Sequence, residues 1–79
     1  MSTIELRRID PERNMARFYL MSVQPDLFGG WILMREWGRI GQAGTLRQVP
    51  YPTLDEAEAA LAKLRKAKLT RGYLALTAA

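Results

Sequence analysis

The protein has 79 residues, of which 48% are hydrophobic and 25% are charged, and this is the composition of an ordinary globular protein. A chain of this length forms one domain, so we expect a single domain over residues 1–79 with its core between about 4 and 76. The sequence contains no cysteine and no histidine. It therefore excludes disulfides, thiolate and imidazole metal ligands, and the commonest general bases of enzymes.

Positive charge exceeds negative charge along the chain. Twelve Lys and Arg stand against eight Asp and Glu, a net charge of +4, and this balance favours an anionic partner. All the cations before residue 50 are arginines, whose planar guanidiniums bind phosphate oxygens as a fork and stack on flat rings. No apolar run approaches the ~18 residues that span a bilayer, and the N-terminus has no signal-peptide pattern. We expect a cytoplasmic protein without membrane contact.

The first half of the chain has the pattern of antiparallel strands joined by short turns. Apolar residues alternate with charged ones over residues 4–10 and predict a first strand, and aromatic and branched residues predict a second strand over 17–23. A third strand is predicted from residue 30 to 39 or 40. The glycines of residues 41–44, Gly-Gln-Ala-Gly, favour a hairpin turn into a fourth strand over 45–49.

One helix is predicted after the strands. Pro50 and Pro52 end the fourth strand near Tyr51, because proline cannot donate a ladder hydrogen bond. Thr53 and Glu56 then match a capping box, and apolar residues recur every three or four positions after them. Acidic residues in the first turn and basic residues near the end complement the helix dipole, and Gly72 is expected just past the end.

The last segment, Tyr73-Leu74-Ala75-Leu76, is compatible with a short final strand and with an extended tail. Together the elements predict the α+β class, with an antiparallel sheet of about four strands and one long helix packed on one face. The other face of the sheet is expected to be open.

The third strand separates two sets of side chains, because successive residues of a strand point to opposite faces. One set is the Trp/Arg row of Trp31, Leu33, Arg35, Trp37 and Arg39. The other set is Ile32, Met34, Gly38 and Ile40, interrupted by Glu36. Burying guanidiniums is costly, so we expect the second set to face the core and the Trp/Arg row to stay exposed. Within the row we assign Trp31 and Leu33 to structural support.

No constellation of residues predicts catalysis. Ser22 has no histidine to activate it, and the carboxylates fit turn formers or ion-pair partners such as Glu36 among the arginines. Gly38, Gly41 and Gly44 are spaced by three, but no Lys-Ser/Thr follows and the next element is a strand, so they indicate hairpin chemistry rather than a phosphate loop. We expect a protein that is not an enzyme and that uses no metal or cofactor.

The third strand ends in Arg35-Glu36-Trp37-Gly38-Arg39. A flat aromatic flanked by guanidiniums on its own side suits stacking on a sugar or base while the guanidiniums bind phosphates. The sequence resembles a WGR domain, the module named for the Trp-Gly-Arg tripeptide found here at 37–39. The resemblance covers roughly residues 4–76 and includes further segments: Arg17-Phe18-Tyr19, Leu27-Phe28-Gly29, Trp31, Ile40-Gly41, Gly44, and Gly72-Tyr73 after the helix.

This resemblance implies a small bacterial protein related to the WGR domain of the DNA-damage-dependent poly(ADP-ribose) polymerases. In those enzymes the domain binds near DNA breaks and packs its tryptophan on the sugar of the terminal nucleotide, and Trp37 matches that tryptophan by position. Arg39 matches the motif arginine, which there also helps to dock neighbouring domains. Tyr73 matches an aromatic residue that lies near the DNA end in some members. Some of the polymerases have an asparagine-rich segment before the second strand, and this chain keeps one asparagine there, Asn14. No counterpart of the catalytic domain is present, so no ADP-ribosyl transfer is implied.

Three roles for the Trp/Arg row follow. The first is that of a non-enzymatic nucleic-acid-binding module that recognises DNA, including strand ends or nicks. Its expected contact residues are Trp37, Gly38, Arg39, Arg35, Arg17, Asn14 and Tyr73. The second is that of a protein–protein docking module using the same face, because Trp and Arg are typical anchors of interfaces. The third is purely structural and places Trp37 in the core.

Overall fold

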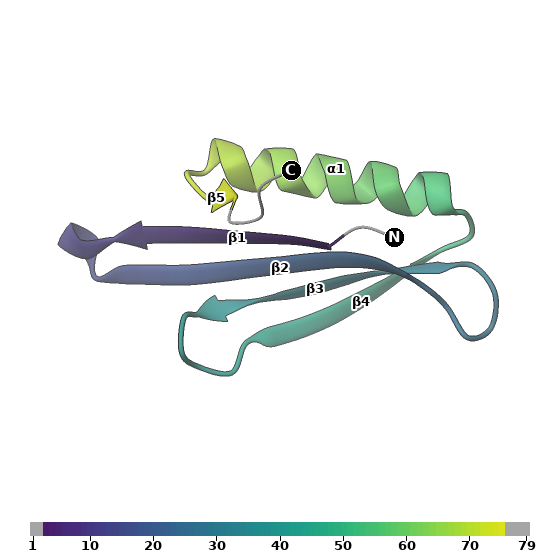
Figure 1. The fold of residues 1–79 in the computed structure, drawn as a ribbon, viewed down its shortest axis with the longest axis horizontal. Coiled ribbons are helices and arrows are strands. Elements are labelled where there is room, and N and C mark those ends of the chain that lie inside the picture. Colours follow the sequence, from purple (N-terminus) through teal and green to yellow (C-terminus); the bar gives the residue numbers. More distant parts are fainter. Residues whose placement is uncertain (1–2, 76–79) are drawn as a thin grey trace.

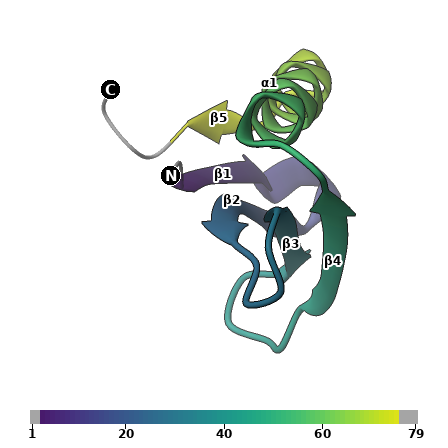
Figure 2. The ribbon, with the colours of Figure 1, turned by 90° about the vertical axis from the view of Figure 1, so that its right-hand side faces the viewer.

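A single helix lies across one face of a curved, five-stranded antiparallel sheet (Figure 1, Figure 2). The computed structural model describes residues 3–75. The strands follow the order β4-β3-β2-β1-β5, and every neighbouring pair is antiparallel. The elements are β1 (Thr3–Asp10), the 3₁₀ helix η1 (Pro11–Arg13), β2 (Met15–Pro25), β3 (Trp31–Arg39), β4 (Thr45–Tyr51), α1 (Leu54–Thr70) and β5 (Leu74–Ala75). The predicted α+β class is confirmed, with one strand more than the expected four.

The second strand extends beyond its predicted ends of 17 and 23, to Met15–Pro25. β2 begins at Met15, because Asn14 takes a left-handed φ of 51° that reverses the chain after η1. β4 ends at Tyr51 as predicted, and it includes Pro50, which an edge strand tolerates since its outer side needs no hydrogen-bond donor. Leu74 and its neighbour pair with β1 as the short fifth strand, so this part of the final segment is a strand. The last residue of that segment, Leu76, lies outside the described residues.

Local sequence sets both ends of α1. The Thr53 hydroxyl accepts a hydrogen bond of 3.2 Å from the backbone N–H of Glu56, which is the predicted N-cap contact. The helix ends at Thr70, and Gly72, with a φ of 96°, turns the chain back toward the sheet. The apolar stripe of the helix lies on the sheet, where Ala57 and Leu61 are buried in the core.

The core lies between α1 and the face of the sheet that carries the Trp/Arg row. Its buried side chains are Leu6, Tyr19, Met21, Val23, Leu33, Ala57, Leu61 and Tyr73. Leu33 belongs to the row and is 3% exposed, whereas Ile32 and Met34 are half-buried on the opposite face. The prediction that Ile32 and Met34 face the core, and that the row is the uncovered side, was wrong.

The neighbouring strand β2 decides which side of β3 faces the helix. Val23 lies opposite Leu33 in the sheet register, whereas the polar Ser22 lies opposite Met34. Side chains opposite each other share a face, so the apolar residues of β2 lie on the side of the Trp/Arg row. A helix that covers them also covers the first part of the row, where Trp31 packs against the core as expected of a supporting residue.

Candidate nucleic-acid interface

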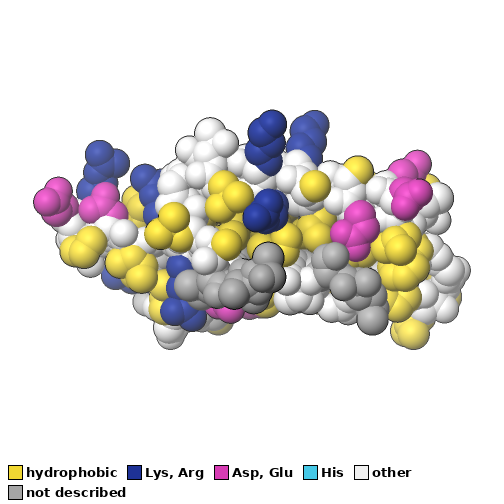
Figure 3. Space-filling view, turned by 45° about the horizontal axis from the view of Figure 1, so that its top comes forward, with side chains coloured by type: hydrophobic (Ala, Val, Ile, Leu, Met, Phe, Trp, Pro, Cys, Tyr) yellow, Lys and Arg dark blue, Asp and Glu magenta, His cyan; other side chains and the backbone are white. Residues whose placement is uncertain are grey.

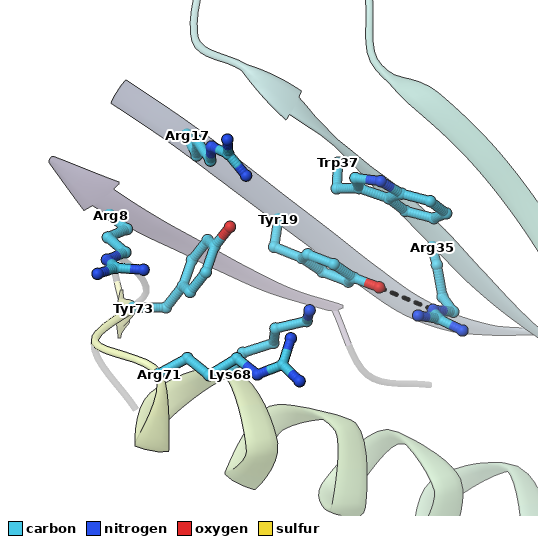
Figure 4. Close-up of a pocket in the computed structure, with 8 residues that line it drawn as sticks. All are labelled: Arg8, Arg17, Tyr19, Arg35, Trp37, Lys68, Arg71 and Tyr73. Atoms are coloured by element: carbon cyan, nitrogen blue, oxygen red, sulfur yellow. Dashed lines mark hydrogen bonds between the residues drawn. The ribbon is translucent and has the colours of Figure 1, made fainter. Parts of the chain in front are cut away.

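α1 leaves one end of the covered face open, and a cavity of about 360 Å³ lies there between the sheet and the end of the helix (Figure 4). Five cations and three aromatic rings line it: Arg8, Arg17, Arg35, Lys68, Arg71, Tyr19, Trp37 and Tyr73. We call this cavity the basic pocket. Within residues 3–75, no aspartate or glutamate lines it.

The sheet register places the first part of the basic pocket. Arg8 of β1 lies opposite Arg17 of β2, and Tyr19 of β2 lies opposite Trp37 of β3. Residues two apart on a strand share a face, so Arg35 joins Trp37 and Arg17 joins Tyr19 on the floor of the cavity. Three strands thus contribute to one surface.

The end of α1 forms the other wall. Arg71 and Tyr73 both donate backbone hydrogen bonds of 3.1 Å to the carbonyl of Lys68, which fixes the turn after the helix. Gly72 occupies the left-handed position of this turn, and a Cβ there would lie 3.5 Å from the Arg8 side chain. This tight turn returns Tyr73 to the sheet, where it is 9% exposed.

The three rings pack on one another inside the basic pocket. Tyr19 and Trp37 are stacked, with ring centroids 5.6 Å apart and planes inclined by 9°. Tyr73 meets Tyr19 edge-on at 6.3 Å and 88°. Tyr19 is 2% exposed and Trp37 is half-buried, so Tyr19 is the support and Trp37 is the ring that remains accessible to a ligand.

Two cations are held against these rings. The Arg35 Nε donates a hydrogen bond of 2.8 Å to the Tyr19 hydroxyl, and its guanidinium lies 5.4 Å from the Trp37 ring centroid. The Lys68 Nζ lies 4.6 Å from the Tyr19 ring centroid. Both distances fall within the range of cation–π attraction. The rings therefore hold the two cations in place at the wall of the basic pocket.

The basic pocket concentrates positive charge, and no carboxylate of residues 3–75 lines it. Burial lowers the pKa of the Lys68 ammonium below its ordinary value of 10.5, and the charges of Arg71 and Arg35 lower it further. The ion pairs Arg7–Glu5 and Arg13–Asp10 involve none of the pocket's cations. Such a site attracts anions, because a bound anion relieves the repulsion among the cations.

Four of the residues expected to form the site meet in the basic pocket: Trp37, Arg35, Arg17 and Tyr73. They come from β2, β3 and the turn after α1, which are distant in the sequence. Figure 4 shows them around one cavity, with the hydrogen bond between Arg35 and Tyr19 drawn below Trp37.

The other three expected residues do not line the pocket. Arg39 donates hydrogen bonds of 3.1 and 3.3 Å to the carbonyl and the side-chain oxygen of Asn14, and this pair closes the end of the β2–β3 ladder. A Cβ on Gly38 would lie 3.0 Å from the Cα of Gly44. Gly38 therefore permits the close approach of the backbone of its own hairpin.

Four pocket residues were absent from the predicted set: Arg8, Tyr19, Lys68 and Arg71. Two of them carried a signal in the sequence. Arg8 is two residues after Leu6 on the same strand and therefore shares its face, and Lys68 falls on the apolar stripe of the helix. Each is thus a cation at a position where the pattern predicts a core residue. Arg71 gave no such signal, because the turn after the helix decides its position.

Residues 3–75 contain no cluster of three or more carboxylate, histidine or cysteine side chains placed to hold a metal ion. In the same part of the chain, no helix has the length and apolar character required to cross a membrane.

The fold and the site define a small α+β domain, with one helix across a five-stranded antiparallel sheet and a cationic pocket lined by aromatic rings. Residues 2–79 match the WGR domain, and the chain belongs to this family.

A relative in Sinorhizobium fredii (strain NBRC 101917 / NGR234), the uncharacterized protein y4dW, is 43% identical over 68 residues. The match covers 86% of this chain and 33% of the relative, so the chain spans about a third of the length of that curated relative. No solved structure gives a significant match to the chain.

Proposed function

We propose that this domain is a non-enzymatic module that binds nucleic acid through the basic pocket, with DNA as its ligand. The observation that carries the proposal is a single cavity with five cations, three aromatic rings and no lining carboxylate within residues 3–75. Clustered cations bind phosphates, and flat rings stack on bases or sugars. Family membership supports the same function, because the WGR domain is known as a nucleic-acid-binding module in poly(ADP-ribose) polymerase-like proteins.

Different residues of the basic pocket are suited to different parts of the nucleic acid. The exposed Arg17 and Arg71 offer their guanidiniums to phosphate oxygens. Arg35 and Lys68 are held by the Tyr19 ring and hydroxyl, so they meet a phosphate with little loss of side-chain entropy. Trp37 offers its ring to a sugar or base.

Strand ends and nicks suit this geometry better than continuous duplex. A base within a duplex is stacked on both of its faces, whereas a terminal nucleotide leaves one face free to pack on Trp37. The wall formed by the end of α1 encloses the cavity on one side and favours a chain that terminates in it. DNA ends or nicks are therefore the form of ligand that we propose.

Fluorescence anisotropy of a labelled blunt-ended duplex tests the proposal. We expect a Kd of about 10⁻⁴–10⁻⁶ M at physiological salt and a slope of log K against log salt between about −3 and −5. Trp37→Ala and Arg17→Gln should each weaken binding, whereas Arg47→Gln, an exposed cation of β4 outside the pocket, should have a smaller effect. A closed circular duplex should compete less well than a linear one of the same sequence.

Several results would count against the proposal. They are the absence of binding at low salt, equal binding by wild type and Trp37→Ala, and equal losses for Arg17→Gln and Arg47→Gln. A protein partner that is retained after nuclease treatment and lost in Trp37→Ala would favour the docking alternative.

A further inference from the structure

The loop between β2 and β3 holds two large apolar side chains in solvent. Leu27 and Phe28 are each 95% exposed, more than any other large apolar residue within 3–75. We call this pair the apolar tip. Two adjacent, fully exposed apolar residues are costly to hydrate, and such patches mark interaction surfaces.

The loop is built to present the apolar tip. The Asp26 carboxylate accepts a hydrogen bond of 3.3 Å from the Phe28 backbone N–H, and the Asp26 N–H donates to the Gly30 carbonyl at 3.0 Å. Gly29 and Gly30 take φ values of 92° and 82°, which side-chain-bearing residues rarely adopt. A Cβ on Gly30 would lie 2.9 Å from the Tyr51 carbonyl oxygen, so the loop is packed against the end of β4.

The apolar tip is remote from the basic pocket. Pro25 and Trp31 pair at the loop end of the sheet, whereas Arg17 and Arg39 pair at the opposite end (Figure 1). The charge near the tip is also of the opposite sign. Asp26 lies in the loop, acidic residues occupy the first turn of α1, and Figure 3 shows acidic side chains gathered at the end where α1 begins. Nucleic acid and anionic lipid are therefore poor partners for the tip.

An apolar groove of about 300 Å³ lies between α1 and the β3–β4 part of the sheet. Its lining includes Val49, Tyr51, Ala60, Leu64 and Ala67 together with the exposed cation Lys63. No carboxylate within residues 3–75 lines it. The groove therefore offers an apolar floor and a positive edge, which complement the apolar side chains and negative surroundings of the tip.

We propose that the apolar tip of one copy of this domain docks into the groove of a second copy. Because the tip and the groove are different surfaces, two arrangements satisfy the contact: an isologous dimer in which two copies exchange tips about a two-fold axis, or a heterologous chain of successive copies. Two side chains in one groove form an interface below the standard size, so the association is weak, with a Kd on the order of 0.1–1 mM.

Sedimentation equilibrium of the full chain tests the proposal. The weight-average mass of the wild type should rise above the monomer mass of 9.0 kDa as the concentration approaches about 1 mM. The double variant Leu27→Ser/Phe28→Ser should stay monomeric. Its matched control is Ile9→Ser/Leu46→Ser, which removes two exposed apolar residues outside the tip and should associate as the wild type does.

The groove is tested separately. Ala67→Gln places a polar amide in the groove without changing the charge, and it should weaken self-association about tenfold. Ala62→Gln makes the same change at an exposed helix position that does not line the groove, and it should have no effect.

Mixing the two defective proteins gives the decisive result. The Leu27→Ser/Phe28→Ser protein retains an intact groove and Ala67→Gln retains an intact tip, so the mixture should form a 1:1 complex that neither protein forms alone at the same concentration. A wild type that remains monomeric at 1 mM would overturn the proposal, and so would a mixture without a complex. Loss of association in the tip variant but not in Ala67→Gln would overturn the assignment of the groove.

Duplex binding by the tip variant keeps this outcome separate from the proposed function. The tip variant should bind DNA as the wild type does, and its unfolding transition should be unchanged, because neither side chain contributes to the core.

Discussion

Trp37 is stacked on Tyr19, with ring centroids 5.6 Å apart and planes inclined by 9°. The Tyr19 hydroxyl accepts the hydrogen bond from Arg35, so one buried residue supports both the ring and the nearest guanidinium of the basic pocket. Tyr19 is 2% exposed and cannot itself meet a large ligand. Its role is to fix the positions of two residues that can.

Tyr19→Phe separates these two roles. The ring stack remains, whereas the 2.8 Å hydrogen bond to Arg35 is lost. We expect the free energy of unfolding to fall by about 1 kcal/mol and duplex binding to weaken several-fold, because Arg35 becomes free to adopt other rotamers. Urea unfolding and anisotropy titration measure the two effects. Tyr51→Phe, which removes a hydroxyl outside the pocket, is the control, and an equal loss of binding in both variants would contradict the positioning role.

Trp37→Ala should spare the fold. Trp37 is half-buried, so its removal should lower the free energy of unfolding by about 1–2 kcal/mol, whereas Leu33→Ala, at a 3% exposed position of the same strand, should lower it by about 2–5 kcal/mol. Chemical denaturation of both variants makes the comparison. A larger loss for Trp37→Ala than for Leu33→Ala would favour the structural interpretation of Trp37.

Lys68 should make the stability depend on pH under alkaline conditions. Its pKa in the folded protein lies below the ordinary 10.5, so between these two values the unfolded chain binds more protons than the folded chain. The contribution of Lys68 to the free energy of unfolding therefore rises with pH across this window. Below the window Lys68 is charged in both states and its full destabilising effect is present; above the window it is neutral in both states.

Lys68→Met removes this contribution. The difference in unfolding free energy, wild type minus Lys68→Met, should become more positive as the pH rises toward 10.5. Urea unfolding at a series of pH values measures it, with Lys63→Met, which replaces an exposed lysine of the helix outside the basic pocket, as the reference. A difference in unfolding free energy that does not change with pH would contradict the lowered pKa of Lys68 that burial and the neighbouring arginines cause.

Gly44→Ala should destabilise the β3–β4 hairpin by steric overlap. A Cβ at this position would lie 2.7 Å from the Trp37 carbonyl oxygen and 2.8 Å from the Phe18 ring. We expect a loss of about 1–3 kcal/mol, together with weaker duplex binding because the backbone of Trp37 must shift. At Gly41 the space is open and only the φ of 89° is unfavourable, so Gly41→Ala should weaken stability without the loss of binding. Equal binding by Gly44→Ala and wild type would contradict the coupling.

The sequence by itself determined the local features of this protein. Thr53 and Glu56 define the start of the helix, Gly72 its end, and the glycines of 41–44 the hairpin, because capping and turn chemistry depend on residues only a few positions apart. The Trp-Gly-Arg tripeptide likewise indicated the WGR family, and the family match over residues 2–79 confirms it. Among the site residues, Trp37 and Arg35 share a face through simple alternation along one strand.

Only the tertiary structure decided which face of β3 is covered and which residues complete the site. Both sides of β3 carry apolar residues, so alternation alone cannot select one, and the choice depends on the residues of β2 that lie opposite. Lys68 and Arg71 join the pocket because α1 ends above Tyr19, while Arg39 leaves it because Asn14 binds its guanidinium. The basic pocket is a property of three strands and a helix end packed together, and contacts of such long range have no periodic signal in the chain.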